Sequence, residues 1–329
     1  MAGVQGSALA IAVSQAGGLG SLPAAMLAPD RLRDELTAIT RQTAKPYNVN
    51  FFCHTPPPPD DGRDARWRDL LLPYYRELGV DPVAIQAGPG RTPFGHDAAD
   101  VLESFKPPVV SFHFGLPSAE LLDRIRKWRP MILSSATTVD EARWLEARGV
   151  DAIIAQGFEA GGHRGMFLSE DLTRQVGTLA LVPQIVHAVR VPVIAAGGIA
   201  DAAGVAAALA LGAAAVQIGT TYLLCPEATT TRVHRDALAS PRAQHTAVTN
   251  VFTGRPARAI ANRFVAELGP MNAAAPAFPR ASAVLLPLRA KAEAQGSGEF
   301  SPLWAGQNVS GCRGVPAATL TTDLAARVG

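Results

Sequence analysis

Short apolar runs recur along this chain, and each is followed by a stretch that can form a helix. Runs this short, apolar nearly throughout and rich in Val and Ile, are typical of strands buried on both faces of a sheet. Alternation of strand and helix at roughly 20-residue spacing predicts βαβ units and a parallel sheet. The seven predicted strands are Leu19–Leu22, Tyr47–Phe52, Val109–Gly115, Met131–Thr137, Asp151–Gly157, Val191–Gly198 and Ala214–Thr220.

Three further segments predict helices. Thr138–Arg148 has apolar residues at helical spacing, and Asp201 is placed to cap an alanine-rich helix over Asp201–Leu211. Ser7–Ser14 is apolar enough for the core of a secretory signal, but no Lys or Arg precedes it. Because a secretory signal has a basic segment before its apolar stretch, we expect a buried helix that ends at Gly17-Gly18 instead.

Two parallel architectures fit this alternation, a doubly wound dinucleotide-binding sheet and a TIM (β/α)8-type barrel. The first should carry G-x-G-x-x-G after an early strand, and the sequence has neither that string nor a P-loop. A barrel gathers its chemistry at the carboxyl ends of its strands. Polar and glycine residues lie at the predicted strand ends: Asn50, Gln156-Gly157, Gly197-Gly198 and Gly219-Thr220. We therefore predict an α/β barrel. Val83–Gln86 is a candidate eighth strand.

The pattern changes after Leu224, which predicts a second, smaller unit. Pro226–Leu268 is polar and helix-like, and Pro270–Leu303 is rich in Pro, Gly and small residues. We expect a barrel over residues 1–224, a helical substrate or lid domain over 225–302, and a C-terminal segment, 303–329, that returns to the barrel. A chain of 329 residues is long enough for about two domains.

Composition excludes several classes of function. Thirty Lys and Arg against 28 Asp and Glu leave a net charge of +2, too balanced for a nucleic-acid-binding surface. No clean apolar run reaches the ~20 residues that cross a membrane. The three cysteines, Cys53, Cys225 and Cys312, lie far apart without metal-binding spacing, so we expect no metal and a reduced, cytoplasmic compartment.

The segment Gln156–Gly165 (Q-G-F-E-A-G-G-H-R-G) is the most informative for chemistry. Its glycines let the backbone approach a ligand, and His163 titrates near neutral pH, so it can accept a proton or stand beside an anion. A loop histidine alone is more often a surface or hydrogen-bonding residue, but the glycines and the strand-end position favour catalysis. Glu159 could orient His163 or be solvated, and Arg164 could neutralise an anion or face water; the sequence leaves both questions open.

Two more glycine loops follow consecutive predicted strands, Ala195–Ile199 and Gln217–Thr220. Such loops present several N–H groups at once, and the N-terminus of a following helix adds partial positive charge. Either loop alone could simply be a tight turn. Together, at the expected barrel positions, they suit a phosphate dianion.

These motifs resemble the nitronate monooxygenase family, formerly called 2-nitropropane dioxygenases. The resemblance rests on Gln156–Gly165, on residues 195–220, and on shorter matches at 1–22, 48–52, 253–258 (T-G-R-P-A-R) and 303–307 (L-W-A-G-Q), so it covers nearly the whole chain. It implies an FMN-dependent barrel with a helical substrate domain. The implied reaction is the oxidation of alkyl nitronates, such as propionate 3-nitronate, by O₂ to a carbonyl compound and nitrite.

The resemblance also implies site residues and partners. His163 falls on the family's active-site histidine, and the implied partners are a small nitronate or nitroalkane, O₂ and a second copy in a homo-oligomer. The implied FMN-binding residues are Met1, Ala2, Gly3, Asn50, Gln156, Gly161, Gly162, Gly197, Gly198, Gln217, Ile218, Gly219 and Thr220.

Two alternatives stay open. An FMN-dependent reductase that uses NAD(P)H, of the enoyl-ACP reductase or quinone reductase type, shares the E-A-G-G-H core and the G-G-I segment. The other alternative is a flavin-binding protein without turnover.

One departure from the family pattern concerns the first strand. In the family, a strand of the type P-I-I-Q-A-P leads into M-A-G, whereas this sequence begins at that Met. We expect either a start that lacks this strand or a barrel of seven strands. The former is favoured, and because a missing strand exposes two sheet edges, it would weaken FMN binding.

Overall fold

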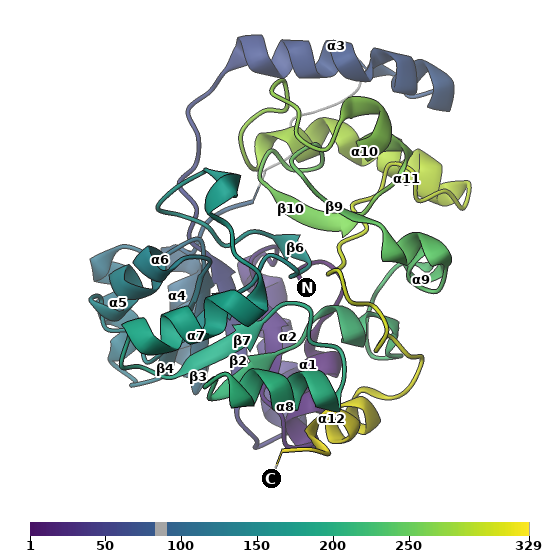
Figure 1. The fold of residues 1–329 in the computed structure, drawn as a ribbon. Coiled ribbons are helices and arrows are strands. Elements are labelled where there is room, and N and C mark those ends of the chain that lie inside the picture. Colours follow the sequence, from purple (N-terminus) through teal and green to yellow (C-terminus); the bar gives the residue numbers. More distant parts are fainter. Residues whose placement is uncertain (83–90, 329) are drawn as a thin grey trace.

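Seven parallel strands form a curled sheet in the lower part of the molecule as drawn in Figure 1. This computed structural model describes residues 1–82 and 91–328. All seven predicted runs contain strands, and the sheet is a half-barrel of the TIM type. In order across the sheet the strands are β1 (Gly20–Pro23), β2 (Tyr47–Phe52), β3 (Val109–His113), β4 (Met131–Ala136), β5 (Ala152–Gln156), β7 (Val193–Ala196) and β8 (Ala215–Gln217).

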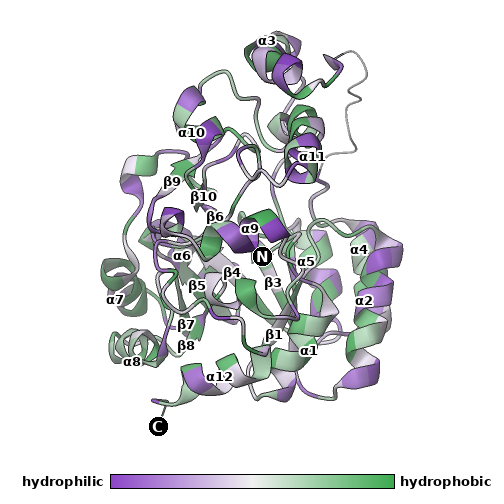
Figure 2. Ribbon diagram, turned by 90° about the vertical axis from the view of Figure 1, so that its right-hand side faces the viewer, coloured by the Kyte–Doolittle hydropathy of each residue, from purple (hydrophilic) through white to green (hydrophobic). Residues whose placement is uncertain are grey.

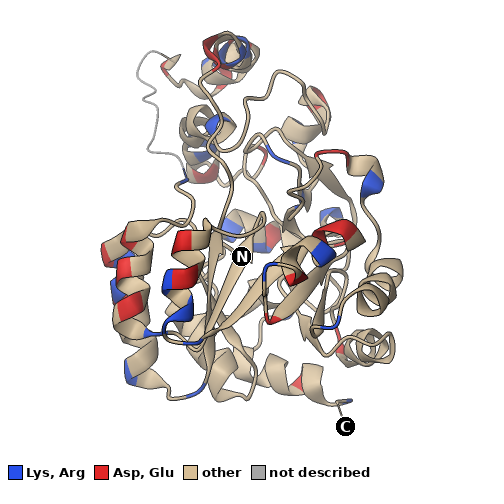
Figure 3. Cartoon of the chain, turned by 90° about the vertical axis from the view of Figure 1, so that its left-hand side faces the viewer, with Lys and Arg blue, Asp and Glu red and all other residues tan. Residues whose placement is uncertain are grey.

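Helices flank this sheet, and several of them carry charged residues, while the strands between them are uncharged (Figure 3). The side chains of Ser118, Thr138 and Asp201 each accept a hydrogen bond from a backbone N–H three residues further on, which starts a helix. The helices predicted over Ser7–Ser14, Thr138–Arg148 and Asp201–Leu211 are all observed. The flanking helices are α1 (Ser7–Gln15), α2 (Pro29–Gln42), α4 (His96–Phe105), α5 (Ala119–Arg126), α6 (Val139–Glu146), α7 (Thr178–Ala188) and α8 (Ala202–Ala210).

The largest hydrophobic core lies between the sheet and these helices. Leu36, Val49, Ile125, Ile153 and Ile185 are all fully buried there. Burial of each such side chain contributes about 1.5–3 kcal/mol. Figure 2 shows purple and green alternating along α2 and α4, as expected for helices with one face on the core and one in solvent.

Strand β8 differs from the prediction of strands buried on both faces. Its Ala215 and Gln217 are exposed, whereas every residue of β5 is buried. Among the described residues, β8 does not pair with β1, so one side of β8 has no neighbouring strand. The sheet therefore ends in two edges. The candidate eighth strand, Val83–Gln86, lies outside the described residues.

A second hydrophobic core lies beyond the carboxyl ends of the strands, at the top of Figure 1. It brings together Trp67 and Tyr75 of α3 (Asp61–Leu78), Phe264 of α10 (Arg263–Leu268) and Leu288 of α11 (Leu286–Ala294). We call this part of the molecule the upper unit. Although α3 comes early in the chain, it packs in the upper unit rather than against the barrel.

The upper unit also contains a short sheet. Strands β9 (Thr246–Thr249) and β10 (Ala257–Ile260) are antiparallel, and β10 also pairs with β6 (Gly162–His163). The helix-like interpretation of Pro226–Leu268 was therefore wrong for these two strands. The second partner of β10, strand β6, comes from a distant segment, and the local sequence pattern does not show this pairing.

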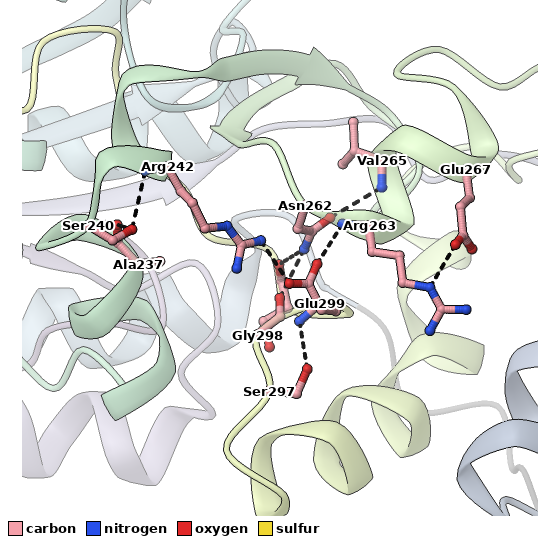
Figure 4. A network of polar contacts seen from close by, with 11 residues as sticks. Ala237, Ser240, Arg242, Asn262, Arg263, Val265, Glu267, Ser297, Gly298 and Glu299 are labelled. Carbon is pink, nitrogen blue, oxygen red and sulfur yellow. Dashed lines mark hydrogen bonds and ion pairs between the residues drawn. The ribbon is translucent and has the colours of Figure 1, made fainter.

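Polar side chains connect the remaining loops of the upper unit (Figure 4). Asn262 accepts a hydrogen bond from the Val265 N–H at the start of α10 and donates to the carbonyl oxygens of Gly298 and Ser301. The Glu299 carboxylate accepts from the Arg263 N–H at 2.6 Å and pairs with Arg242 at 2.9 Å. These contacts fix the segment 297–301 against α10.

The chain then returns to the barrel. Leu320 and Leu324 of α12 (Ala317–Ala325) pack with Leu9 of α1 and Val205 of α8. Among residues 1–82 and 91–328, no helix is long and apolar enough to cross a membrane. The other short elements are α9 (Arg232–Leu238) and the 3-10 helices η2 (Leu172–Arg174), η3 (Thr220–Leu224), η4 (Pro241–Gln244) and η5 (Arg280–Leu285).

Candidate active site

His163 lies where the barrel meets the upper unit. It belongs to β6, shortly after β5, and pairs with Ala257 of β10. Four aromatic side chains surround its ring, and we call them the aromatic cage. The ring centroids lie 6.0 Å from Phe52, 6.0 Å from Phe114, 5.2 Å from Phe278 and 5.4 Å from Trp304. The imidazole is thus held in a desolvated, largely apolar setting.

The backbone of His163 is held by side chains from neighbouring strands. Gln156, the last residue of β5, donates from Nε2 to the His163 carbonyl at 3.0 Å and accepts from the Gly165 N–H at 2.7 Å. Nε2 of His113, at the end of β3, lies 3.2 Å from the same carbonyl, and Nδ1 lies 3.0 Å from Ser135 Oγ. Since a carbonyl only accepts, the proton of His113 sits on Nε2. Burial lowers the pKa of His113 to about 3, so its ring is neutral.

The hydrogen bonds of the His163 ring assign its tautomer. Nε2 lies 3.0 Å from Thr253 Oγ1, and the Thr253 hydroxyl lies 3.4 Å from the Arg255 carbonyl. Because that carbonyl can only accept, Thr253 donates to it and its oxygen accepts from Nε2–H. No other residue among those described forms a hydrogen bond with Nδ1, so Nδ1 keeps an open lone pair.

Burial sets the charge of this ring. Desolvation, followed by the positive charge of Arg91, lowers the pKa of His163 well below its usual range. The imidazole is therefore neutral at pH 7 and able to accept a proton at Nδ1.

Glu159 and Arg164 do not have the site roles considered from the sequence. The Glu159 carboxylate accepts from the N–H and hydroxyl of Thr178, at 2.8 and 2.7 Å, and so caps the start of α7 instead of orienting His163. Arg164 is fully buried and donates to the carbonyls of Gln156 and Gly157 and to the side chain of Gln175. Of the alternatives that the sequence left open, Glu159 does not orient His163, and Arg164 neither faces water nor has its side chain free for an anion.

The predicted glycine loops have the conformations that favour glycine. Gly162, Gly197 and Gly198 have φ of +72°, +119° and +72°. A Cβ at Gly162 would meet no atom within 4 Å, so the backbone there borders open space.

The same loops expose backbone donors. Within the described residues, the N–H groups of Gly198 and Gly219 donate to no acceptor. They follow the adjacent strands β7 and β8, and such free donors suit a phosphate.

Other predicted binding residues serve packing as well. Asn50 donates to Ser111 Oγ at 2.9 Å. A Cβ at Gly161 would lie 2.5 Å from the Gly306 nitrogen, so glycine there permits contact with the C-terminal segment. The Thr220 hydroxyl accepts from the Gly306 N–H at 2.9 Å, which joins the β8 loop to that segment.

The remaining predicted residues lie around the β8 edge. Met1 faces Gly219, where a Cβ would be 3.7 Å from the Met1 sulfur, and burial lowers the pKa of its amino group. Ala2 follows in the same turn, and Gly3 faces Met26. Ile218 packs in the core with α8 and α12, so it offers only its backbone, and Gln217 is exposed.

Sequence reasoning missed several residues around His163. Thr253 and Arg255 lie in the T-G-R-P-A-R motif, which marked the family without showing a role. His113 and Phe114 end an otherwise apolar run, so a histidine at a strand end was the available signal. Arg91 lies in a loop, and no local pattern marks it.

Comparison with known proteins agrees with this geometry. A family model described as nitronate monooxygenase matches residues 1–326. Nitronate monooxygenases of Paraburkholderia phytofirmans and Pseudomonas aeruginosa are 42% and 41% identical, each over 98% of this chain and over 89% and 93% of their own lengths.

Two solved structures are similar in fold. Nitroalkane oxidase from Streptomyces ansochromogenes matches with a TM-score of 0.89 and 40% identity, over 100% of this chain and 93% of that one. FabK from Thermotoga maritima matches with a TM-score of 0.73 and 28% identity, over 99% of this chain and 90% of that one. From the full-length family match and the identities above 40%, this chain belongs to the nitronate monooxygenase family.

Proposed function

We propose that this protein oxidises alkyl nitronates with O₂ to a carbonyl compound and nitrite, with FMN as its cofactor. The observation that carries the proposal is the neutral imidazole of His163, whose Nδ1 is open inside the aromatic cage, in a molecule that also has free N–H groups at Gly198 and Gly219 after strands β7 and β8. The curated relatives named nitronate monooxygenase support the same reaction.

The glycine loops fit the phosphate of FMN, because their free N–H groups lie at the ends of adjacent strands without a Cβ in the way. We assign phosphate contacts to Gly198, Gly219 and Thr220, and ring contacts to Asn50 and Gln156. The family is flavin-dependent. When bound, FMN supplies a carrier of single electrons between the organic substrate and O₂.

His163 acts on the carbon next to the nitro group. With a neutral nitroalkane, its Nδ1 takes the α-proton, and the depressed pKa keeps the base form present at pH 7. With a nitronate, that proton is already gone, and the same ring positions the anion. The aromatic cage packs the carbon chain and excludes water.

Nitrite release from propionate 3-nitronate tests the proposal. We expect His163→Asn to keep FMN, seen from the flavin absorbance, and to lower turnover roughly 10²-fold, the usual scale of a lost acid–base group. An unchanged rate would remove His163 from the mechanism. Anaerobic NADH serves as a control, because rapid flavin bleaching would favour the reductase alternative instead.

Thr253 provides a sharper test of the imidazole tautomer. Thr253→Ser keeps the hydroxyl and should keep activity, whereas Thr253→Val removes the acceptor for Nε2–H. We expect the valine variant to lose roughly tenfold in kcat with neutral nitroalkanes, since this contact fixes the tautomer that leaves Nδ1 open. With a preformed nitronate the loss should be smaller. Equal losses with both substrates would contradict the assignment.

Several wider expectations remain proposals. We propose a barrel over 1–224, a substrate domain over 225–302 assisted by α3, a C-terminal segment over 303–329, and a homo-oligomer. Cys53, Cys225 and Cys312 are free thiols, which supports a reduced, cytoplasmic compartment.

A further inference from the structure

Two arginines near His163 have no carboxylate partner. Among the described residues, neither Arg91 nor Arg255 forms an ion pair, and Arg91 Nη1 and Arg255 Nε are buried without a hydrogen-bond partner. Arg255 makes one hydrogen bond, from Nη2 to the Met166 carbonyl. A buried donor without an acceptor costs about 1–3 kcal/mol. Such a cost is offset when a ligand supplies the missing acceptors.

Both guanidinium groups stand against rings of the aromatic cage. The Arg255 guanidinium carbon is 4.1 Å from the centroid of Phe114, and that of Arg91 is 5.4 Å from the centroid of Phe278. Each of these rings in turn contacts His163. Each arginine is therefore one aromatic ring away from the imidazole, a span that a short carbon chain can cover.

The backbone around the arginines is held in place at some cost. Phe114 has a φ of +71°, a left-handed conformation that costs a non-glycine residue roughly 1–2 kcal/mol. This conformation places its ring beneath Arg255. On the other side, buried His54 lies 4.8 Å from the Phe278 ring, and its Nε2 holds the Arg91 carbonyl at 3.0 Å.

The local charge is one-sided. His163 and His113 are neutral, and the charges of Glu141 and Glu170 reach Arg255 without pairing with it. Glu141 instead accepts from the Thr137 hydroxyl and the Phe167 N–H. Among the described residues, neither cationic group is thus paired directly with a carboxylate, and burial lowers the pKa of Arg91 to about 10.

We propose that Arg91 and Arg255 bind a carboxylate at the far end of the substrate chain, and so select carboxylated nitronates and nitroalkanes over those with an uncharged tail. This inference rests on the proposed function, because it takes His163 as the position of the reacting carbon. Bidentate guanidinium–carboxylate contacts are strong and directional, which suits the orphaned donors.

Substrate discrimination tests the inference. In Arg91→Met and Arg255→Met, we expect kcat/KM for propionate 3-nitronate to fall at least tenfold, mainly through KM, while that for propane-1-nitronate changes less than threefold. Arg255→Lys should recover part of the loss because it keeps the charge. Arg148→Met is the matched control, since exposed Arg148 also stacks on a ring, 3.6 Å from the centroid of Trp144 on α6. Equal losses with both substrates, or no loss, would overturn the inference.

A binding measurement separates this inference from the proposed function. Isothermal titration calorimetry with succinate, which does not react, should show binding to the wild type, at least tenfold weaker binding to both methionine variants, and little binding of the uncharged succinamide. If the wild type binds succinate through these arginines but releases no nitrite from propionate 3-nitronate, the result contradicts the proposed reaction and supports the carboxylate site. A wild type that binds succinamide as well as succinate would sink the carboxylate site.

Discussion

The two sides of His163 differ in how their polar groups are satisfied. On the lower side, Arg164 donates to three acceptors, and the Gln156 amide both donates a hydrogen bond and accepts one. On the upper side, Arg91 and Arg255 leave guanidinium nitrogens without partners. Buried polar groups are normally paired. We therefore assign the paired groups of the lower side to the stability of the fold and the unpaired groups of the upper side to ligand binding. Residue type alone does not separate these roles, because three of the four residues are arginines.

The largest effect should come from breaking the lower side. Arg164→Met would remove the buried donor to the Gln156 carbonyl and to the Gln175 side chain, whereas the Gly157 carbonyl would still accept from the Ala160 N–H. At about 1–3 kcal/mol for each buried unsatisfied group, we expect a loss of about 3–5 kcal/mol in the free energy of unfolding. Urea denaturation of the two proteins measures it. A loss below about 1 kcal/mol would contradict the structural role assigned to Arg164.

The pH dependence of the free energy of unfolding tests both sides together, because His113 belongs to the lower side and His54 to the upper side. Burial lowers the pKa of His113 to about 3 and those of His54 and His234 to about 4, against about 6.5 in the unfolded chain. Unfolding therefore takes up protons below pH 6.5, so stability is full above that pH and falls as the pH drops toward 4. Each histidine contributes up to about 1.4 kcal/mol per pH unit.

Urea midpoints measured from pH 7 down to pH 5 check this dependence. A flat profile would contradict the neutral, buried state of these rings.

The smallest effect on stability should come from the upper side. Arg255→Met removes a desolvated charge that forms no ion pair among the described residues, and the methionine still packs on Phe114. We expect the free energy of unfolding to change by less than about 1 kcal/mol, with gain as well as loss consistent with the argument. Thermal denaturation without ligand measures it. A loss as large as that in Arg164→Met would erase the distinction between the two sides.

The barrel could be predicted from sequence because its strands are continuous apolar runs. The upper unit was harder to predict, because its contacts join distant segments. The Tyr75 hydroxyl, for example, donates to the Val284 carbonyl, which lies 209 residues further along the chain. Strands β9 and β10 are only four residues each, and β10 also pairs with the distant strand β6.

The site was predictable to the extent that backbone conformation left a trace in the sequence. The glycines at 162, 197 and 198 mark left-handed backbone, and the loop around His163 matched a known motif. Arg164 and Arg255 look alike in sequence, since each is an arginine beside a glycine or proline. Which of the two guanidinium groups has a hydrogen-bond partner for each of its nitrogens depends on the carbonyls that the fold brings to it. Their roles could therefore be assigned only from the three-dimensional structure.

Strand β6 belongs to the barrel by its covalent connection and to the upper sheet by its hydrogen bonds. His163 pairs there with Ala257, and the Arg164 N–H donates to the Pro256 carbonyl at 2.9 Å. A hinge motion that lifted the upper unit as a rigid body would have to break this ladder or drag the imidazole along. The ladder therefore keeps the imidazole in register with both the barrel and the upper unit.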